Sequence, residues 1–363
     1  MRKTFGLLAL VLIMVFSLAA CGGSSSSSSN GGGSSSGGSG ESTDSGGSSS
    51  GGSSEGSSED TGSSGGGSGD FVPVTLSTGT TSGVYYPLGA QLAKFWSQAG
   101  LEASSQASDG SVQNLNLLQQ GKITAALTTI GVLYNAYNGK GKFEGRAFKD
   151  VRAITTTYPN VGQIVARAGT GIKTVSDLKG HKFVPGAPGS STRVLSKHIL
   201  EAYGLTFKDV KPQFVGFTQA ADLMRNKQID ATVMMAGIPT SGIVQVMTTA
   251  DGQFIPVDEA HIKKMQEKYP WISGFTIPAG TYDGQDQDVL QPAQANVLVV
   301  KKSMPEEEVY KLTKVMWENI DKIRKSVAAT KNMKLKSATT GLSGIPLHPG
   351  AKKYYKEKGV LNK

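Results

Sequence analysis

The folded part of the chain alternates between two hydrophobic patterns. Short runs of apolar residues and threonine, such as Ile123–Thr129 and Ile229–Met235, are typical of strands covered on both faces. Between such runs, apolar residues recur at helical spacing, as at Leu88, Leu92 and Phe95. Strands that alternate with helices predict an α/β fold. Because the alternation occurs twice, we expect two similar lobes with a cleft between them.

The connection between the lobes is expected at a pair of strands. The segments Val151–Thr157 and Val161–Ala166 both have strand patterns, and Tyr158, Pro159 and Asn160 separate them. A chain that leaves the first lobe through such a pair enters the second lobe directly afterwards. The predicted division is a first lobe of about residues 70–162 and 300–363, and a second lobe of about 163–299.

The C-terminal part is expected to rejoin the first lobe. Ala295–Val300 is the last strongly apolar strand pattern, and it could carry the chain back. Met304–Lys325 follows it and predicts one long helix, since a proline and three glutamates stand at its start, where the helix dipole is positive.

One glycine-rich stretch, Phe183–Leu205, has the features of an anion site. It predicts a strand end, a tight turn at two glycines and an amphipathic helix. One of the three hydroxyl residues at 190–192 is expected to cap the helix, whose first N–H groups carry partial positive charge, and Arg193 adds a formal charge. These residues predict binding of an anion, a carboxylate above all. An ordinary capped helix with a solvent-facing arginine fits the same pattern.

Similar loops follow other predicted strands. They lie at 78–85, 108–111, 186–193 and 237–240, and Ser111 is a candidate cap for a helix that runs to residue 120. The first loop is not a phosphate-binding P-loop, because no lysine follows its last glycine. Ligands of open α/β sheets bind beyond the carboxyl ends of the strands. We therefore expect the four loops to face one another across the cleft.

The N-terminal 69 residues predict export and a tether. Residues 1–20 have a basic start and a short apolar run, as in a signal peptide. Cleavage before Cys21, the only cysteine, resembles the lipobox of bacterial lipoproteins, which implies a lipid on Cys21. Residues 22–69 contain 40 glycines and serines among 48 residues, a composition typical of a flexible linker. The protein is therefore expected outside the cell membrane, anchored to its outer face.

The charge of residues 70–363 leaves several partners open. Their 35 basic and 23 acidic residues give a net charge of +12, which suits nucleic acid, an anionic membrane or an anionic solute. Export argues against nucleic acid, and most of the lysines are expected on a solvated face, near anionic lipid. The single cysteine excludes a disulfide within the chain.

The pattern disfavours an enzyme. Ser190 follows a glycine, but the sequence there is G-S-S-T-R rather than the G-x-S-x-G of a nucleophile elbow. The four histidines, at 181, 198, 261 and 348, are scattered, and no metal-ligand cluster is visible. We expect no catalytic residue, no metal and no cofactor.

Several stretches together resemble the TAXI family of TRAP-transporter receptors. They are TGTTSGVYYPLGAQLA at 78–93, DGSVQNLNLLQQGKI at 109–123, AYNG at 136–139, PGAPGSSTRVLSKHILEAYGL at 185–205, QIDATVMMAGIPT at 228–240 and PLHPGAKKYYKEKG at 346–359. The resemblance implies a two-lobed periplasmic binding protein fold of type II. It also implies capture of a small organic acid, such as glutamate or a dicarboxylate, for delivery to a TRAP permease.

The resemblance and the loops together define a candidate ligand-binding set. Tyr158 and the loop at 237–240 are implied to close over the solute. The whole set is Thr80, Thr81, Ser82, Gly83, Val84, Tyr85, Ser111, Tyr158, Gly189, Ser190, Ser191, Thr192, Arg193, Gly237, Pro239 and Thr240.

Two departures from the family pattern leave alternatives open. The strand after Ile123 reads TAALTTIG, where an acidic residue, Gln and Asp are expected, so the solute could differ from the usual acids. The first loop has Thr80, Thr81 and Ser82 where glycines are commoner, which makes it more polar. An ABC-type receptor would have a similar fold and cleft, and a sensor or surface lipoprotein would need the same cleft without transport.

Overall fold

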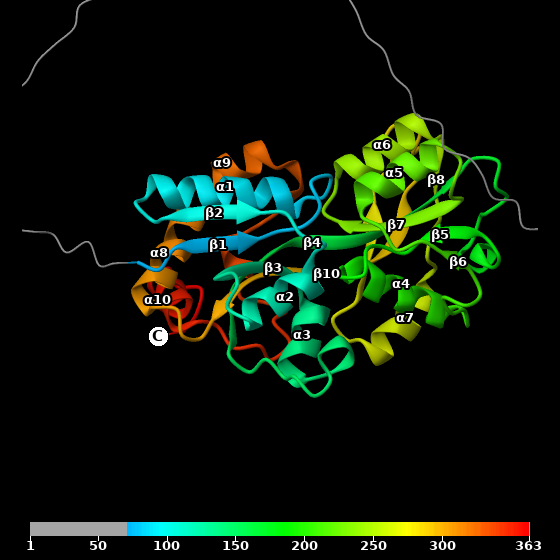
Figure 1. Cartoon of the computed structure of the whole chain (residues 1–363). Helices are drawn as coiled ribbons and strands as arrows, with labels where there is room; N and C mark the ends of the chain where they lie inside the picture. Colours follow the sequence, from blue (N-terminus) through cyan, green and yellow to red (C-terminus); the bar gives the residue numbers. More distant parts are fainter. Residues whose placement is uncertain (1–70, 363) are drawn as a thin grey trace, which may run out of the picture. The chain divides into compact units, whose positions relative to one another are not determined.

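A mixed sheet of ten strands forms the centre of the computed structural model, which describes residues 71–362 (Figure 1). The strands are β1 (Val74–Ser77), β2 (Ala103–Gln106), β3 (Ala125–Thr129), β4 (Val151–Arg167), β5 (Lys182–Val184), β6 (Lys211–Pro212), β7 (Ala231–Ala236), β8 (Gly252–Phe254), β9 (Ser273–Ile277) and β10 (Val289–Lys301). The α-helices are α1 (Tyr85–Gln98), α2 (Ser111–Gln119), α3 (Ile130–Asn138), α4 (Ser191–Ala202), α5 (Phe217–Arg225), α6 (Ser241–Thr249), α7 (Glu259–Lys268), α8 (Glu306–Glu318), α9 (Ile320–Ser326) and α10 (Pro349–Glu357). The predicted signal peptide, Cys21 and linker lie outside the described residues.

The strand order is β2-β1-β3-β10-β4-β7-β5-β6, with β8 paired to β4 and β9 to β10. At one end β1 runs parallel to β2 and β3, and at the other β5 runs parallel to β6 and β7. We call the first group, with α1–α3 and α8–α10, the first lobe, and the second group, with α4–α7, the second lobe. The two-lobed α/β architecture predicted from the alternating patterns is confirmed.

Two long antiparallel strands, β4 and β10, join the lobes. Strand β4 pairs with β7 of the second lobe from Val161 onward, and β10 pairs with β3 of the first lobe from Asn296 onward. The prediction of two strands separated at Tyr158–Asn160 is wrong, because β4 is continuous through them. Pro159, exposed to solvent, lies opposite Ala295, beside a register shift in the pairing. An irregularity of this kind tolerates a residue that lacks an N–H donor.

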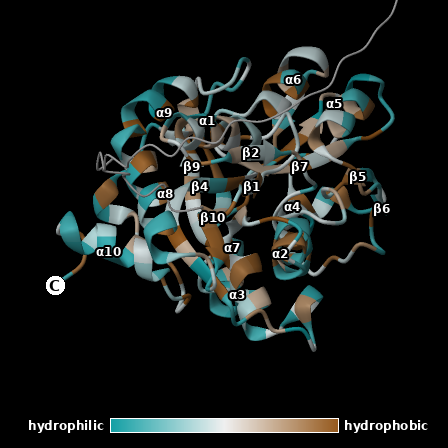
Figure 2. Ribbon diagram, turned by 60° about the vertical axis from the view of Figure 1, so that its left-hand side comes forward, coloured by the Kyte–Doolittle hydropathy of each residue, from teal (hydrophilic) through white to brown (hydrophobic). Residues whose placement is uncertain are grey.

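Apolar side chains cover both faces of the sheet. One cluster fixes α1, α8 and α10 to the first lobe through buried residues such as Trp96, Leu312 and Tyr354. A second cluster lies between the second-lobe strands and helices α4 and α7, and a third lies under α2 and α3. Hydrophobic residues accordingly follow the central strands in Figure 2, whereas the outer helix α10 is largely hydrophilic.

The predicted helix Met304–Lys325 is two helices, α8 and α9, which meet at Asn319. The backbone of Asn319 leaves helical geometry, at φ −104° and ψ 13°, and its Nδ2 donates to the Val315 carbonyl at 2.9 Å. Asparagine competes for backbone partners in this way, which favours helix ends. Among residues 71–362, no helix combines the length and apolar character needed to cross a membrane.

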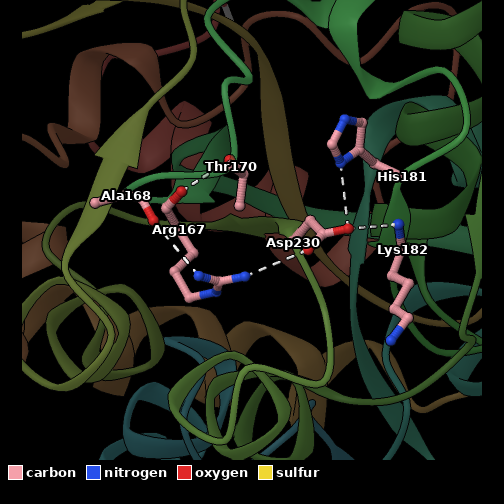
Figure 3. A network of polar contacts seen from close by, with 6 residues as sticks. All are labelled: Arg167, Ala168, Thr170, His181, Lys182 and Asp230. Carbon is pink, nitrogen blue, oxygen red and sulfur yellow. Dashed lines mark hydrogen bonds and ion pairs between the residues drawn. The ribbon is translucent and has the colours of Figure 1, made fainter.

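A network of ion pairs and hydrogen bonds around Asp230 lies in the second lobe (Figure 3). Asp230, just before β7, lies 3.4 Å from Nη2 of Arg167 and 3.2 Å from Nδ1 of His181, and accepts the Lys182 N–H at 3.0 Å. Burial raises the pKa of Asp230, but these hydrogen bonds and positive charges outweigh it and hold the pKa below its ordinary value of 3.8. The network therefore ties the ends of β4, β5 and β7 together while Asp230 is ionised.

Asp230→Asn should lower the free energy of unfolding by about 1–3 kcal/mol at pH 7, since it removes charge-assisted hydrogen bonds. A depressed folded-state pKa stabilises above the unfolded value, and this stabilisation disappears as the pH falls through the lowered pKa. Urea denaturation at pH 7 and pH 3 should therefore show the wild type and variant converging in acid. Asp222→Asn, which breaks an exposed pair with Arg225, is the control and should change little. A constant difference across the pH range would contradict the assignment.

Candidate functional site

A small, partly open cavity lies at the carboxyl ends of β1 and β7, where the lobes meet. Its volume is about 40 Å³. This exceeds the roughly 10–15 Å³ that one water molecule needs, and hydrogen bonds between the lobes border the cavity. The lining residues are Gly79, Thr80, Gly83, Val84, Tyr85, Asp109, Gly110, Tyr158, Asn160, Ser191, Thr192, Phe217, Met235 and Ala236.

Three helices begin at the cavity. Val84 precedes α1 without a side-chain cap, Gly110 precedes α2 with φ at 113°, and Ser190 caps α4 by accepting the Arg193 N–H. The predicted cap at the start of α4 is confirmed, whereas Ser111 is not a cap. It is the first residue of α2, and its Oγ accepts the Thr129 N–H at 3.1 Å. Helix N-termini carry partial positive charge, which favours an anion at this wall, but at α2 the N–H groups of Val112 and Gln113 already donate to the Gly189 carbonyl.

Of the polar side-chain groups of the hinge strand β4 that are buried without a partner among the described residues, two belong to residues that line the cavity. They are the hydroxyl of Tyr158 and Oδ1 of Asn160, on side chains only 1% and 2% exposed. Burial, and secondarily the neighbouring Tyr85, raises the pKa of Tyr158, so its hydroxyl is a neutral donor near pH 7. Because buried polar atoms normally have partners, these two groups are suited to a ligand in the cavity.

Tyr85 of α1 is held in place rather than free. Its hydroxyl donates to Oδ1 of Asn296 at 2.6 Å, and Asn296 in turn donates to the Tyr158 carbonyl at 3.0 Å. The rings of Tyr85 and Tyr158 pack edge to face at 6.5 Å. The two tyrosines, from the first lobe and the hinge, therefore form one wall of fixed geometry.

The lobes are hydrogen-bonded to each other around the cavity. The Gly189 carbonyl accepts the N–H groups of Val112 and Gln113 at 3.0 and 3.1 Å, which links the loop before α4 to α2. The Ser82 carbonyl accepts from the Gly242 N–H and from two hydroxyls, Thr240 Oγ1 and Ser241 Oγ, at 3.0–3.1 Å. Both carbonyls bind the start of a helix in the opposite lobe, so these contacts form only when the cleft is closed.

The structure brings about half of the predicted ligand residues to the cavity. Thr80, Gly83, Val84, Tyr85, Tyr158, Ser191 and Thr192 line it. Ser82, Gly189 and Thr240 make contacts between the lobes. Ser190 and Ser111 shape the helix starts, Gly237 packs on the Tyr158 ring, Pro239 follows a cis peptide bond, and Thr81 is exposed.

Arg193 does not reach the cavity. Its guanidinium lies 4.2 Å from the centre of the Phe214 ring, and Arg193 lines a separate hollow between α4 and the first lobe. Asp109, exposed at the mouth, is the one charged side chain on the cavity wall within residues 71–362. The predicted pairing of a carboxylate with Arg193 is therefore not what this geometry offers.

Sequence reasoning missed Asn160 and the apolar wall of Phe217, Met235 and Ala236. Asn160 followed Tyr158 in the predicted connection between strands, and a polar residue at a strand crossing was a usable signal. The apolar residues lie within or next to ordinary core patterns, which gave no sign of a ligand. Within residues 71–362, no three His, Cys, Asp or Glu side chains lie together as a metal site would require.

A model of the NMT1-like family matches residues 76–359, nearly the whole folded unit. The chain belongs to the NMT1-like family. A structure described as a periplasmic transporter aligns with a TM-score of 0.51 at 12% identity, over 81% of this chain and 95% of its own. A protein from Bordetella bronchiseptica RB50 aligns at 20% identity and a TM-score of 0.47, over 80% and 89%.

The alkanesulfonate-binding protein SsuA from Xanthomonas axonopodis pv. citri, bound to MOPS, aligns with the NMT1-like chain at 13% identity and a TM-score of 0.45, over 80% of this chain and 94% of its own. At such identities the similarity shows the fold alone, that of periplasmic solute-binding proteins. The fold that the TAXI resemblance implied is thus confirmed. Membership of the TAXI family and coupling to a TRAP permease are not shown by these similarities.

Proposed function

We propose that this NMT1-like protein is an extracytoplasmic receptor that captures a small organic anion by closing its lobes around it. The observation that carries the proposal is the cavity between the lobes, where the unpaired Tyr158 hydroxyl and Asn160 oxygen meet the starts of three helices. A solute that bridges these groups favours the closed arrangement by its differential affinity for it.

The chemistry of the wall suits one carboxylate and at least one hydrogen-bond donor. The helix starts and the Tyr158 hydroxyl would hold the carboxylate, and Oδ1 of Asn160 would accept a hydroxyl or amino hydrogen of the same solute. No lysine or arginine lines the cavity within residues 71–362, so neutral donors and helix dipoles would balance the charge.

For the transport partner we infer an ABC-type importer, the alternative that the sequence left open, rather than a TRAP permease. The matched family is NMT1-like, and named neighbours include an L-cystine and an amino-acid ABC transporter protein. Cys21 and the linker keep the receptor at the outer face of the membrane in this proposal.

The receptor proposal can be tested by a thermal-shift screen of the purified chain against carboxylates, sulfonates, amino acids and neutral sugars. A solute at 100 times its Kd stabilises the fold by about 2.7 kcal/mol, which such a screen detects. We expect stabilisation by a small carboxylate and calorimetric binding at one site. Stabilisation by a neutral sugar alone would contradict the anion, and a screen without any stabilising solute would contradict the receptor.

Tyr158→Phe should weaken binding of the selected carboxylate about tenfold to hundredfold, because a hydrogen bond to a charged group contributes about 1.5–3 kcal/mol. The unliganded variant should be as stable as the wild type, since the lost hydroxyl has no partner among residues 71–362. Calorimetric titration and thermal unfolding measure the two effects.

Tyr282→Phe is the matched control. The Tyr282 hydroxyl, also buried, donates to Gln163 Oε1 at 2.5 Å and accepts the Thr240 N–H at 3.1 Å. Its removal should therefore cost stability, whereas Tyr158→Phe should cost affinity. Equal effects of the two variants on stability and affinity would show that Tyr158 is a structural residue.

A further inference from the structure

A second hollow, larger than the central cavity, opens between the lobes on the side of α2, α3 and α4. Its volume is about 570 Å³, within the range of small-molecule sites. The first lobe supplies residues of α2, α3 and the short 3₁₀ turn Gly141–Phe143, and the second lobe supplies α4, Phe207 and Tyr269. Figure 2 shows these helices gathered on the same side of the sheet.

The charged residues that line this hollow are all basic. Lys142 comes from the first lobe, and Arg193 and Lys197 come from successive turns of α4. Within residues 71–362, neither Lys142 nor Arg193 pairs with a carboxylate, whereas the exposed Lys197 lies 3.5 Å from Oε1 of the half-buried Glu201, one turn further along α4. Of the described residues, three cations from two lobes line this hollow and no acid does, which favours an anion of charge −2.

Aromatic rings form much of the remaining wall. His198 stacks on Tyr269 with ring centres 3.6 Å apart, and Phe207 packs edge to face on Phe214, the ring that carries the Arg193 guanidinium. Burial, together with the charges of Lys197 and Lys268, lowers the pKa of His198 to about 3, so the imidazole is neutral near pH 7. Neutral aromatic rings and cations on one wall suit a planar ring that bears negative groups.

The hollow lies next to the residues through which the two lobes pack against each other. Val194, on the face of α4 beside Arg193, packs against the first-lobe cluster that contains Val112, Val132 and Phe143. The floor is therefore formed by both lobes, and its width depends on how far the cleft is closed. A molecule that touches both walls would favour closure independently of the solute in the central cavity.

We propose that this hollow is a second ligand site, separate from the central cavity, which binds a planar aromatic dianion between Lys142 of one lobe and Arg193 and Lys197 of the other. The sequence suggested that the Arg193 guanidinium binds an anion, and in this proposal it binds the dianion in the second hollow rather than the solute in the central cavity. The proposal does not depend on the identity of the central solute.

Calorimetric titration of the full-length chain with isophthalate, an aromatic dicarboxylate, tests the site. Isophthalamide has the same ring without charge, and glutarate has the two carboxylates without the ring. We expect isophthalate to bind at least tenfold more tightly than isophthalamide. In the Tyr158→Phe variant, which lacks the hydroxyl in the central cavity, isophthalate should also bind more tightly than glutarate. Absence of isophthalate binding at millimolar concentration, or equal binding of isophthalamide, would overturn the proposal.

Substitutions in the second hollow test whether isophthalate binds there. Arg193→Gln and Lys142→Gln should each weaken isophthalate binding about fivefold or more, whereas Lys179→Gln, an exposed lysine elsewhere in the second lobe, should leave it within twofold. Tyr158→Phe should also leave it unchanged. Equal weakening by all three charge removals would mean non-specific attraction, and loss with Tyr158→Phe would place isophthalate in the central cavity. Either result would refute the second site. Thermal unfolding checks that each variant is folded.

Discussion

Gly189→Val should weaken solute binding at least about tenfold and leave the unliganded protein folded. A Cβ atom at position 189 would lie 3.0 Å from Cβ of Asp109 and 3.1 Å from Cβ of Gln113, both in the opposite lobe. The methyl groups of valine would extend further and keep the lobes apart. The Gly189 carbonyl would then lose its two bonds to the start of α2. Apparent affinity falls in proportion to the population of the closed form, so about 1.4 kcal/mol against closure gives a tenfold loss.

Calorimetry with the solute selected by screening measures this effect, and Gly189→Ala, with a smaller side chain, should give an intermediate result. The thermal midpoint of the unliganded valine variant should remain close to that of the wild type, because the added atoms meet only the other lobe. The same variant should weaken isophthalate binding, since the second hollow also depends on closure. Wild-type affinity in Gly189→Val would contradict the role of this contact in closing the cleft.

Gly350→Ala should destabilise the first lobe by about 3 kcal/mol, the upper part of the range for overpacking. Gly350, in the first turn of α10, lies directly against the backbone of α8. A Cβ atom there would overlap the Glu306 carbonyl oxygen and lie 2.6 Å from the Tyr310 nitrogen. Backbone atoms cannot rotate away as a side chain can, so the two helices would have to separate and lose the packing around Tyr354 and Leu312.

Urea denaturation monitored by tryptophan fluorescence measures this loss. Lys352→Ala, on the exposed face of the same helix, is the control and should change the free energy of unfolding by no more than about 0.5 kcal/mol. A similar stability for Gly350→Ala and Lys352→Ala would show that α10 can shift away from α8 without cost.

Periodicity was sufficient to predict the fold because each buried strand and amphipathic helix carries its own pattern. The apolar runs at β3 and β7 are entirely buried, as their composition indicated. Pro159 led to the wrong prediction of a break between two strands. Whether a strand can contain a proline depends on how the neighbouring strand pairs with it at that position. A strand that crosses between lobes with a local register shift accommodates it, and sequence does not show which strand lies opposite.

The loops at strand ends were located correctly, but their side chains were assigned with less success. Chain direction places Ser191 and Thr192 at the cavity because they begin α4 at a strand end. Arg193 is adjacent in sequence, yet each helical residue turns about 100° from the last, and its guanidinium points to Phe214 instead. The contact with Phe214, 21 residues further along the chain, fixes the position of the guanidinium, and a local sequence pattern does not predict such a contact.

The course of β4 and β10 makes the second lobe an insertion within the first. The chain enters it through one strand and leaves through the neighbouring strand, and both the first described residue and the C-terminal helix α10 pack on the first lobe. Anything attached to either end of the described chain is thus carried by the first lobe, and within residues 71–362 the second lobe is covalently connected to the first through these two strands alone. When the cleft opens, the second lobe can swing on this two-stranded ribbon without pulling on the attached segments.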